Sequence, residues 1–335
     1  MKVIFNQKNI INDILKKKNN SKISLNIFLI KIILVGILLF LKLYNEYNDY
    51  NKLKNFKLIK KKMFYFDKYE SNIYNNIKEK LLKTKCSNMW SNQREFLNGL
   101  IRKFRPKKIL EIGPSLGGSS IIILNAIKDI RNAHLYSIDL NSREFIGSCV
   151  KDLFPQFLQK WSLYKGNIAA KFIENIGGEI DLVFIDSAHF EPGEILDFLI
   201  VLPFLKEGAI VVFHDIGNQI TSSGGKNTRK EWAPYLIFNI IRGKKYLPSG
   251  NNILTHDIGA IKLEKNQYKY INDYFRALGG QWQYFPKEIY IELARNLFKK
   301  YYNKDCLIIF EEAVLFNRNF VRNNPMENLY KFNSD

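Results

Sequence analysis

The chain has 335 residues, of which 46% are hydrophobic, enough to bury the core of one large domain or two small ones. Residues 1–62 carry 14 Lys, no Arg and 3 acids, a net charge of +11, which leaves +8 of the total +19 for the other 273 residues. Because the charge excess is mostly at one end, it does not indicate a basic nucleic-acid-binding surface, and we expect no nucleic-acid partner. Cys86, Cys149 and Cys306 show neither pairing nor metal spacing, which suits a reducing compartment.

The most apolar stretch of the chain, residues 23–43, follows a basic N-terminal segment at residues 1–22. Sixteen of its 21 residues are Ile, Leu, Phe or Val, and as a helix it would reach roughly 30 Å, about one hydrocarbon thickness. Lys31 costs up to about 3 kcal/mol at the centre of a membrane and less where it can snorkel. We predict a transmembrane helix that anchors the chain to a membrane. A buried helix and a cleaved signal peptide are the alternatives.

Residues 44–89 are polar, aromatic and rich in Lys, and they predict a linker that runs into a helix. Apolar residues at positions 96, 97, 100, 101 and 104 then fit one face of a helix that Pro106 ends.

Strand-like and helix-like segments alternate after Pro106, which predicts a mostly parallel, doubly wound α/β sheet with right-handed crossovers. The expected strands cover residues 108–112, 134–138, 161–165, 181–186 and 209–214, and the expected helices cover residues 118–129, 143–153, 168–176 and 191–204. Ligands of such sheets bind at the carboxyl ends of the strands. The polar residues at these ends are Glu111, Asp139, Asn167, Asp186 and Asp215, whereas Asp181 begins its strand and is expected to be structural.

The segment "EIGPSLGGSS" lies between the first strand and its helix. Its glycines, Gly113, Gly117 and Gly118, are of the kind that lets a ligand approach the backbone, or that allows close packing of helix on strand. A dinucleotide fingerprint would need glycine at position 115, which is Ser, and no Gly-Lys-Ser/Thr follows to make a phosphate-binding P-loop. A cationic sulfonium ligand without a pyrophosphate would suit an acid-rich pocket better than NAD.

Four segments in order, "ILEIGPSLGGSS", "LYSIDLN", "IDLVFIDSAHF" and "LPFLKEGAIVVFHDI", resemble the class I S-adenosylmethionine-dependent methyltransferases. They are most similar to the small-molecule O-methyltransferases of the cephalosporin-biosynthesis and macrolide-sugar type. The resemblance covers residues 90–265 and implies a Rossmann-like methyltransferase domain there. Residues 266–335 would follow it as a C-terminal helical extension, with a late antiparallel strand at 258–263 and a helix at 286–302.

The resemblance implies the cofactor-binding residues. Glu111, Gly113 and Gly117, with Gly118 beside them, would lie along the methionine part of S-adenosylmethionine. Asp139 would hold the ribose, since one carboxylate can accept from both hydroxyls. Asn167 would lie near the adenine.

The resemblance also places Asp186, His214 and Asp215 where some members hold a divalent metal, Mg²⁺ or Mn²⁺. Many of those members have two acids where this chain has the pair His214–Asp215. Both residues of that pair can ligate only if the strand ends at His214. A metal-free version would use His189 or His214 as general base, with Asp186 orienting it.

The expected function is methyl transfer to a hydroxyl of a small molecule or sugar, by a catalytic domain in the cytoplasm, where the cofactor is made. A methyltransferase of nucleic acid or protein is one alternative, although no Asn/Asp-Pro-Pro-aromatic stretch follows the fourth strand. A non-catalytic, membrane-tethered module that kept the fold is the other.

Overall fold

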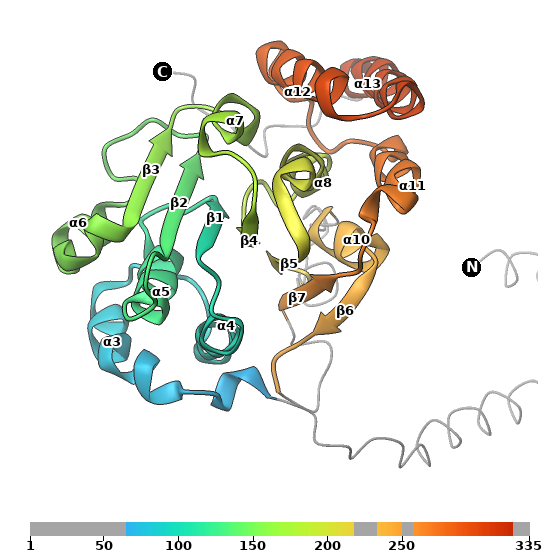
Figure 1. Cartoon of the computed structure of the whole chain (residues 1–335). Coiled ribbons are helices and arrows are strands. Elements are labelled where there is room, and N and C mark those ends of the chain that lie inside the picture. Colours follow the sequence, from blue (N-terminus) through green and yellow to red (C-terminus); the bar gives the residue numbers. More distant parts are fainter. Residues whose placement is uncertain (1–64, 218–232, 250–256, 324–335) are drawn as a thin grey trace, which may run out of the picture. The chain divides into compact units, whose positions relative to one another are not determined.

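A seven-stranded sheet in the order β3-β2-β1-β4-β5-β7-β6 forms the centre of the fold (Figure 1). The structure is a computed structural model that describes residues 65–217, 233–249 and 257–323, all within one unit, Tyr65–Asp335. The strands are β1 (Lys108–Ile112), β2 (His134–Asp139), β3 (Trp161–Lys165), β4 (Ile180–Ile185), β5 (Leu205–His214), β6 (Gly243–Tyr246) and β7 (Ile258–Leu263). β1 to β5 pair in parallel and β7 pairs antiparallel with both β5 and β6.

Helices cover both faces of this sheet. The α-helices are α3 (Ser71–Thr84), α4 (Ser91–Phe104), α5 (Gly118–Ile127), α6 (Ser148–Leu153), α7 (Ile173–Ile176), α8 (Gly193–Val201), α10 (Ala233–Ile240), α11 (Ile271–Arg276), α12 (Glu288–Tyr301) and α13 (Lys304–Asn323). One apolar core packs α3, α4 and α5 against the sheet face that carries Ile109. A second packs α8, α10, α11, α12 and α13 against the face that carries Leu110 and Ile112. The side chains of β1 therefore alternate between two cores, as a strand buried on both faces requires.

The prediction of a mostly parallel α/β sheet is confirmed, and the expected strands agree with β1 to β5 and β7 to within a few residues at their ends. Two expected helices are much shorter than their patterns. In the first, Gly147 adopts φ +74° and starts α6 only at Ser148. In the second, a 3-10 turn, Ala169–Lys171, precedes the single turn of α7, which Gly177 ends with φ +77°. Positive φ at a glycine is what permits both abrupt changes of direction.

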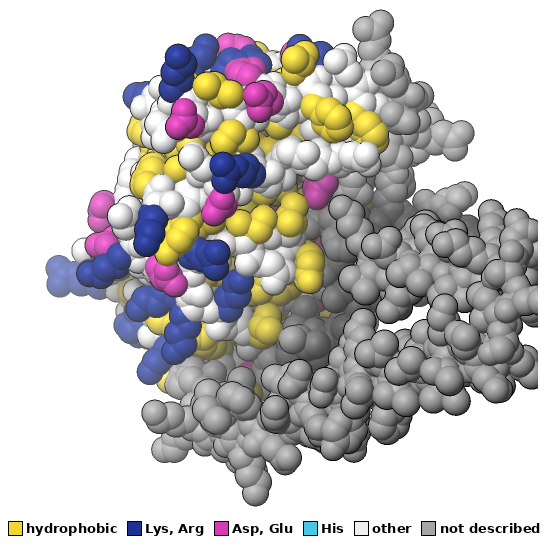
Figure 2. Space-filling model, turned by 90° about the vertical axis from the view of Figure 1, so that its right-hand side faces the viewer, with side chains coloured by type: hydrophobic (Ala, Val, Ile, Leu, Met, Phe, Trp, Pro, Cys, Tyr) yellow, Lys and Arg dark blue, Asp and Glu magenta, His cyan; other side chains and the backbone are white. Residues whose placement is uncertain are grey.

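The sequence did not indicate β6, and within the predicted helical extension at residues 266–335 it indicated a helix only at 286–302, whereas the structure also has α13 at Lys304–Asn323. The predicted anchor at residues 23–43 lies outside the described residues. Within the described ranges, no helix combines the length and the apolar character that crossing a membrane requires. On the face shown in Figure 2, Lys and Arg side chains lie among acidic, hydrophobic and uncharged ones.

Candidate active site

β1 and β4 are neighbours at the point where the strand order reverses, which is the topological switch point at which such folds bind ligands. The glycine loop, residues 113–118, leaves β1 at this point. Gly113 adopts φ +86°, and a Cβ on it would lie 1.8 Å from the backbone oxygen of Asp186. The loop therefore lies directly against the end of β4, and only glycine allows so close an approach.

Close packing also explains the other two glycines of the loop. A Cβ on Gly117, which has φ +98°, would lie 2.8 Å from Val150 Cγ2, and a Cβ on Gly118 would lie 2.2 Å from the backbone oxygen of Cys86. The alternative that these glycines permit tight packing therefore has direct support, and cofactor contact by Gly113, Gly117 and Gly118 stays a prediction.

Glu111 lies beneath the glycine loop and is fully buried. Its carboxylate accepts hydrogen bonds from the hydroxyls of Ser119, Ser120 and Ser137, each at 2.6 Å. Burial raises the pKa of Glu111, and the three hydroxyls partly offset that rise. The predicted contact of Glu111 with the methionine part of the cofactor stays untested. In this arrangement the carboxylate ties the first turn of α5 to β1 and β2, which holds the loop in place.

Asp139 ends β2 beside the glycine loop. Its Oδ2 accepts the backbone N–H of Ser115 at 3.1 Å, and its Oδ1 accepts that of Asn141 at 2.8 Å. Burial raises the pKa of Asp139, against the lowering effect of these two amides. A carboxylate offers about four lone pairs, so two remain for a ligand. Asn167 lies just after β3, with its Oδ1 accepting the N–H of Ile168 at 3.0 Å.

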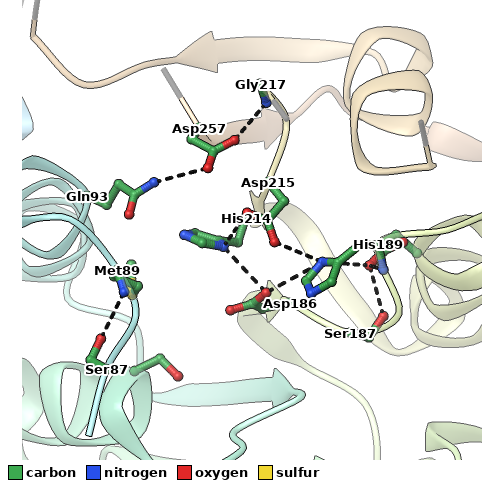
Figure 3. Close-up of polar contacts among 12 residues, drawn as sticks. Ser87, Met89, Gln93, Asp186, Ser187, His189, His214, Asp215, Gly217 and Asp257 are labelled. Carbon is green, nitrogen blue, oxygen red and sulfur yellow. Dashed lines mark hydrogen bonds and ion pairs between the residues drawn. The ribbon is translucent and has the colours of Figure 1, made fainter. Parts of the chain in front are cut away.

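Four predicted residues from two neighbouring strands form one cluster at the carboxyl edge (Figure 3). His189 Nδ1 lies 2.9 Å from Asp215 Oδ2 and 3.9 Å from Asp186 Oδ1. His214 Nδ1 lies 3.4 Å from Asp186 Oδ1 and 3.2 Å from Asp215 Oδ1. β5 ends at His214 and Asp215 adopts φ +55°, so the chain turns where both side chains need it to turn.

Charge balance within the cluster comes from the two imidazoles. Burial alone would lower the pKa of His189, but Asp215, Asp186 and Glu194 outweigh it and raise the pKa to about 10. Burial would likewise lower the pKa of His214, but Asp186 and Asp215 raise it well above its ordinary value. Burial would raise the pKa of Asp215, yet the two imidazoles hold it well below its usual range. The neighbouring carboxylates therefore favour the positively charged form of both rings.

The cluster also has the donors of a metal site. Asp186, His189 and Asp215 form one group able to offer three ligand atoms within 4.8 Å of one another, and His214, Asp215 and Asp257 form a second. His189 Nδ1 and both ring nitrogens of His214 are buried without a hydrogen bond of acceptable geometry to any described residue. Buried polar atoms are normally paired. The two Nδ1 atoms nevertheless face carboxylate oxygens in the ion pairs above, and a divalent cation would take the place of a proton between such nitrogens and carboxylates.

Buried acids support the segment that carries His189. Glu194, at the start of α8, accepts the backbone N–H of His189 at 2.6 Å and the hydroxyl of Ser187 at 3.3 Å. Ser187 also donates to Asp197 at 2.7 Å. Burial raises the pKa of Glu194 to about 7 and that of Asp197 to about 6. His189 itself has φ +61°, a left-handed backbone conformation that residues other than glycine rarely adopt, and the hydrogen bond to Glu194 stabilises it.

Sequence reasoning missed Asp257 and Gln93. Asp257 precedes the antiparallel strand β7 and belongs to the second candidate ligand group. Its Oδ1 accepts the N–H of Gly217 at 3.0 Å, and its Oδ2 lies 3.5 Å from Gln93 Nε2 on α4 (Figure 3). Burial, and then the charge of Asp215, raise the pKa of Asp257 to about 6. The one sequence signal was the predicted late strand at 258–263, because Asp257 directly precedes that strand.

A cavity of about 300 Å³ opens elsewhere, beside α10 and α11, and is lined by residues that include Arg242, Tyr270 and Arg276. None of the predicted site residues lines it. The acid–imidazole cluster and the glycine loop therefore remain the candidate active site.

Comparison with known proteins gives one family match. Residues 110–216, from β1 to the turn after β5, match the family described as "Methyltransferase domain". No curated protein matches the chain.

Solved structures give more distant similarities. The O-methyltransferase TomG from Streptomyces achromogenes, involved in tomaymycin synthesis and solved with SAM, is 20% identical, with 58% of this chain and 88% of that chain covered and a TM-score of 0.42. An O-methyltransferase from Bacillus cereus in complex with SAH is 15% identical, with 57% of this chain and 90% of that chain covered and a TM-score of 0.43.

Proposed function

We propose that this chain, whose residues 110–216 match the methyltransferase domain family, transfers a methyl group from S-adenosylmethionine to a hydroxyl of a small molecule or sugar. The observation that carries the proposal is the adjacency of two parts of the site. The glycine loop touches the backbone of Asp186 at Gly113, and the side chain of Asp186 belongs to the acid–imidazole cluster. A cofactor on the loop and an acceptor on the cluster would then meet at the end of β4.

The cofactor would lie over the glycine loop, with its ribose hydroxyls on Asp139. The two backbone amides that already bind Asp139 fix the carboxylate in place, so the hydrogen bonds to a ribose need little reorganisation. Asn167, at the end of the adjacent strand, would border the adenine.

A divalent cation in the cluster would take Asp186, His214 and Asp215 as ligands, as the resemblance implies, although the ligand atoms that lie within 4.8 Å of one another are those of Asp186, His189 and Asp215 and those of His214, Asp215 and Asp257. Carboxylates alone would suit Mg²⁺, whereas an imidazole ligand shifts the preference toward Mn²⁺. Such an ion would supply Lewis acidity that lowers the pKa of the acceptor hydroxyl. His214 Nδ1, which faces both Asp186 and Asp215, supports this assignment.

His189 would take the proton of the acceptor hydroxyl on Nε2 while Nδ1 faces Asp215, which orients the ring. Asp215, Asp186 and Glu194 raise the pKa of His189, and a divalent cation beside the two aspartates would offset that effect, which would favour the neutral ring that a general base requires.

Residues 23–43 would anchor the chain to a membrane, with the catalytic domain in the cytoplasm. The alternatives are methylation of nucleic acid or protein, and a non-catalytic tethered module.

The test incubates the full chain with methyl-labelled S-adenosylmethionine and a fraction of small molecules and glycans. We expect label in products that survive mild alkali, as methyl ethers do, and loss of that label after chelation or in Asp186→Asn. Asp181→Asn, at the opposite edge of the sheet, is the matched control and should stay active. Label on nucleic acid or protein alone, or full activity of Asp186→Asn, would overturn the proposal.

A further inference from the structure

Two segments that are far apart in the sequence enclose the glycine loop. On one side, the backbone of Gly118 packs against Cys86 and Ser87, where a Cβ would lie 2.2 Å from the Cys86 oxygen. On the other side, Gly117 packs against Val150 of α6. The loop is therefore held between the residues after α3 and the first turn of α6.

Hydrogen bonds fix the second of these segments to the loop. The N–H of Gly147 donates to the backbone oxygen of Ser115 at 2.8 Å, and the N–H of Cys149 donates to that of Leu116 at 3.0 Å. Ser115 in turn donates to Asp139, the predicted ribose ligand. The position of the Asp139 carboxylate, which would hold the cofactor, therefore depends on the position of α6 through the loop backbone.

A disulfide joins the two enclosing segments. Cys86 pairs with Cys149, 63 positions later, while Cys306 is free and buried. The covalent ring contains the whole predicted cofactor site except Asn167, that is, β1, the glycine loop and Asp139. The cysteine spacing showed no sign of this pairing, because only the fold brings the two residues together; the bridge therefore removes the support that the cysteine spacing lent to a reducing compartment.

We propose that the Cys86–Cys149 disulfide positions the glycine loop, so that the oxidised protein binds S-adenosylmethionine and its demethylated product more tightly than the reduced protein. The inference rests on the proposed function. α6 has only six residues and could not hold its place by helix formation alone. Without the bridge, the binding-competent loop would be only fractionally populated, and the apparent affinity would fall by that fraction. We expect an affinity about tenfold weaker after reduction.

Cys149 is partly exposed, so a small phosphine can reach the bridge. Reduction breaks the S–S bond and leaves one proton on each sulfur. The phosphine is oxidised to its oxide with oxygen from water.

The experiment uses the full chain, kept oxidised, and first counts its thiols. One free thiol before reduction and three after it are expected. Calorimetric titration with S-adenosylhomocysteine then compares oxidised protein, reduced protein and Cys149→Ser. Cys306→Ser is the matched cysteine control, and Asp181→Ala is a destabilised control at the opposite edge of the sheet; neither should change the affinity.

Equal affinity before and after reduction, or three thiols in the oxidised preparation, would overturn this inference alone. Weakened binding in Asp181→Ala to the same extent would also overturn it, since general destabilisation would then explain the effect. An oxidised wild-type protein that binds no S-adenosylhomocysteine would instead overturn the proposed function and, with it, this inference.

Discussion

Replacement of Asp139 by alanine is the perturbation that addresses the cofactor site most specifically. The Asp139 carboxylate already accepts two backbone amides, from Ser115 and Asn141, and has two lone pairs left. In the proposed complex, both would accept from ribose hydroxyls. Alanine removes these bonds and also leaves the Ser115 amide, on the glycine loop, without its acceptor.

The expected loss follows from the number of bonds. A hydrogen bond to a charged group contributes roughly 1.5–3 kcal/mol, so two bonds at the lower value amount to about 3 kcal/mol. That is about a hundredfold in the dissociation constant. Calorimetric titration of the full chain with S-adenosylhomocysteine measures it directly. Asp139→Asn keeps one acceptor oxygen and should lose about tenfold.

Asp181→Ala is the matched control, since Asp181 Oδ2 also accepts two backbone amides, from Lys107 at 2.9 Å and Lys108 at 3.0 Å. It lies at the opposite edge of the sheet, so its loss should lower stability without changing affinity. If Asp139→Ala bound the ligand like the wild type, or if Asp181→Ala lost affinity to the same extent, the assignment of the ribose to Asp139 would be refuted.

Three further predictions concern other parts of the chain. Glu111→Ala should lower the free energy of unfolding by about 3 kcal/mol, since three serine hydroxyls lose their acceptor. Because burial raises the pKa of Glu111, the stability that depends on its protonation should be fully present below pH 4.5 and be lost as the pH rises through the folded-state pKa. Denaturation of the wild type and of Glu111→Gln at several pH values measures this dependence. Glu194→Ala should slow methyl transfer while the affinity for S-adenosylhomocysteine is unchanged, because it frees the backbone of His189; slowed transfer in Glu194→Gln, which keeps an acceptor, would contradict this. Residues 23–43 should keep the chain in the membrane fraction through carbonate extraction, and release by carbonate would exclude a spanning helix.

The order of strands and helices could be predicted because β1, β4, β7 and the second half of β5 are short, largely buried apolar runs, which the sequence alone reveals. The residues at the strand ends followed from the same pattern, since parallel strands bring their carboxyl ends to one edge. Asp186, His189, His214 and Asp215 meet for that reason.

What the sequence could not show depends on contacts between distant segments. The disulfide joins Cys86 and Cys149, which are separated in the sequence by a segment that includes β1 and β2. Asp257 reaches the site only because β7 runs antiparallel beside β5. The burial of the Glu111 carboxylate was equally hidden, because a strand-end acid can face either the ligand or the helix, and only the positions of Ser119 and Ser120 decide between them.

The central claim is that the edge formed by the glycine loop and Asp139 binds S-adenosylmethionine. Calorimetric titration of the oxidised full chain with S-adenosylmethionine, and separately with NAD, tests it most directly. We predict saturable binding of S-adenosylmethionine with one site per chain and no comparable binding of NAD. Absence of S-adenosylmethionine binding, or tighter binding of NAD, would contradict the account.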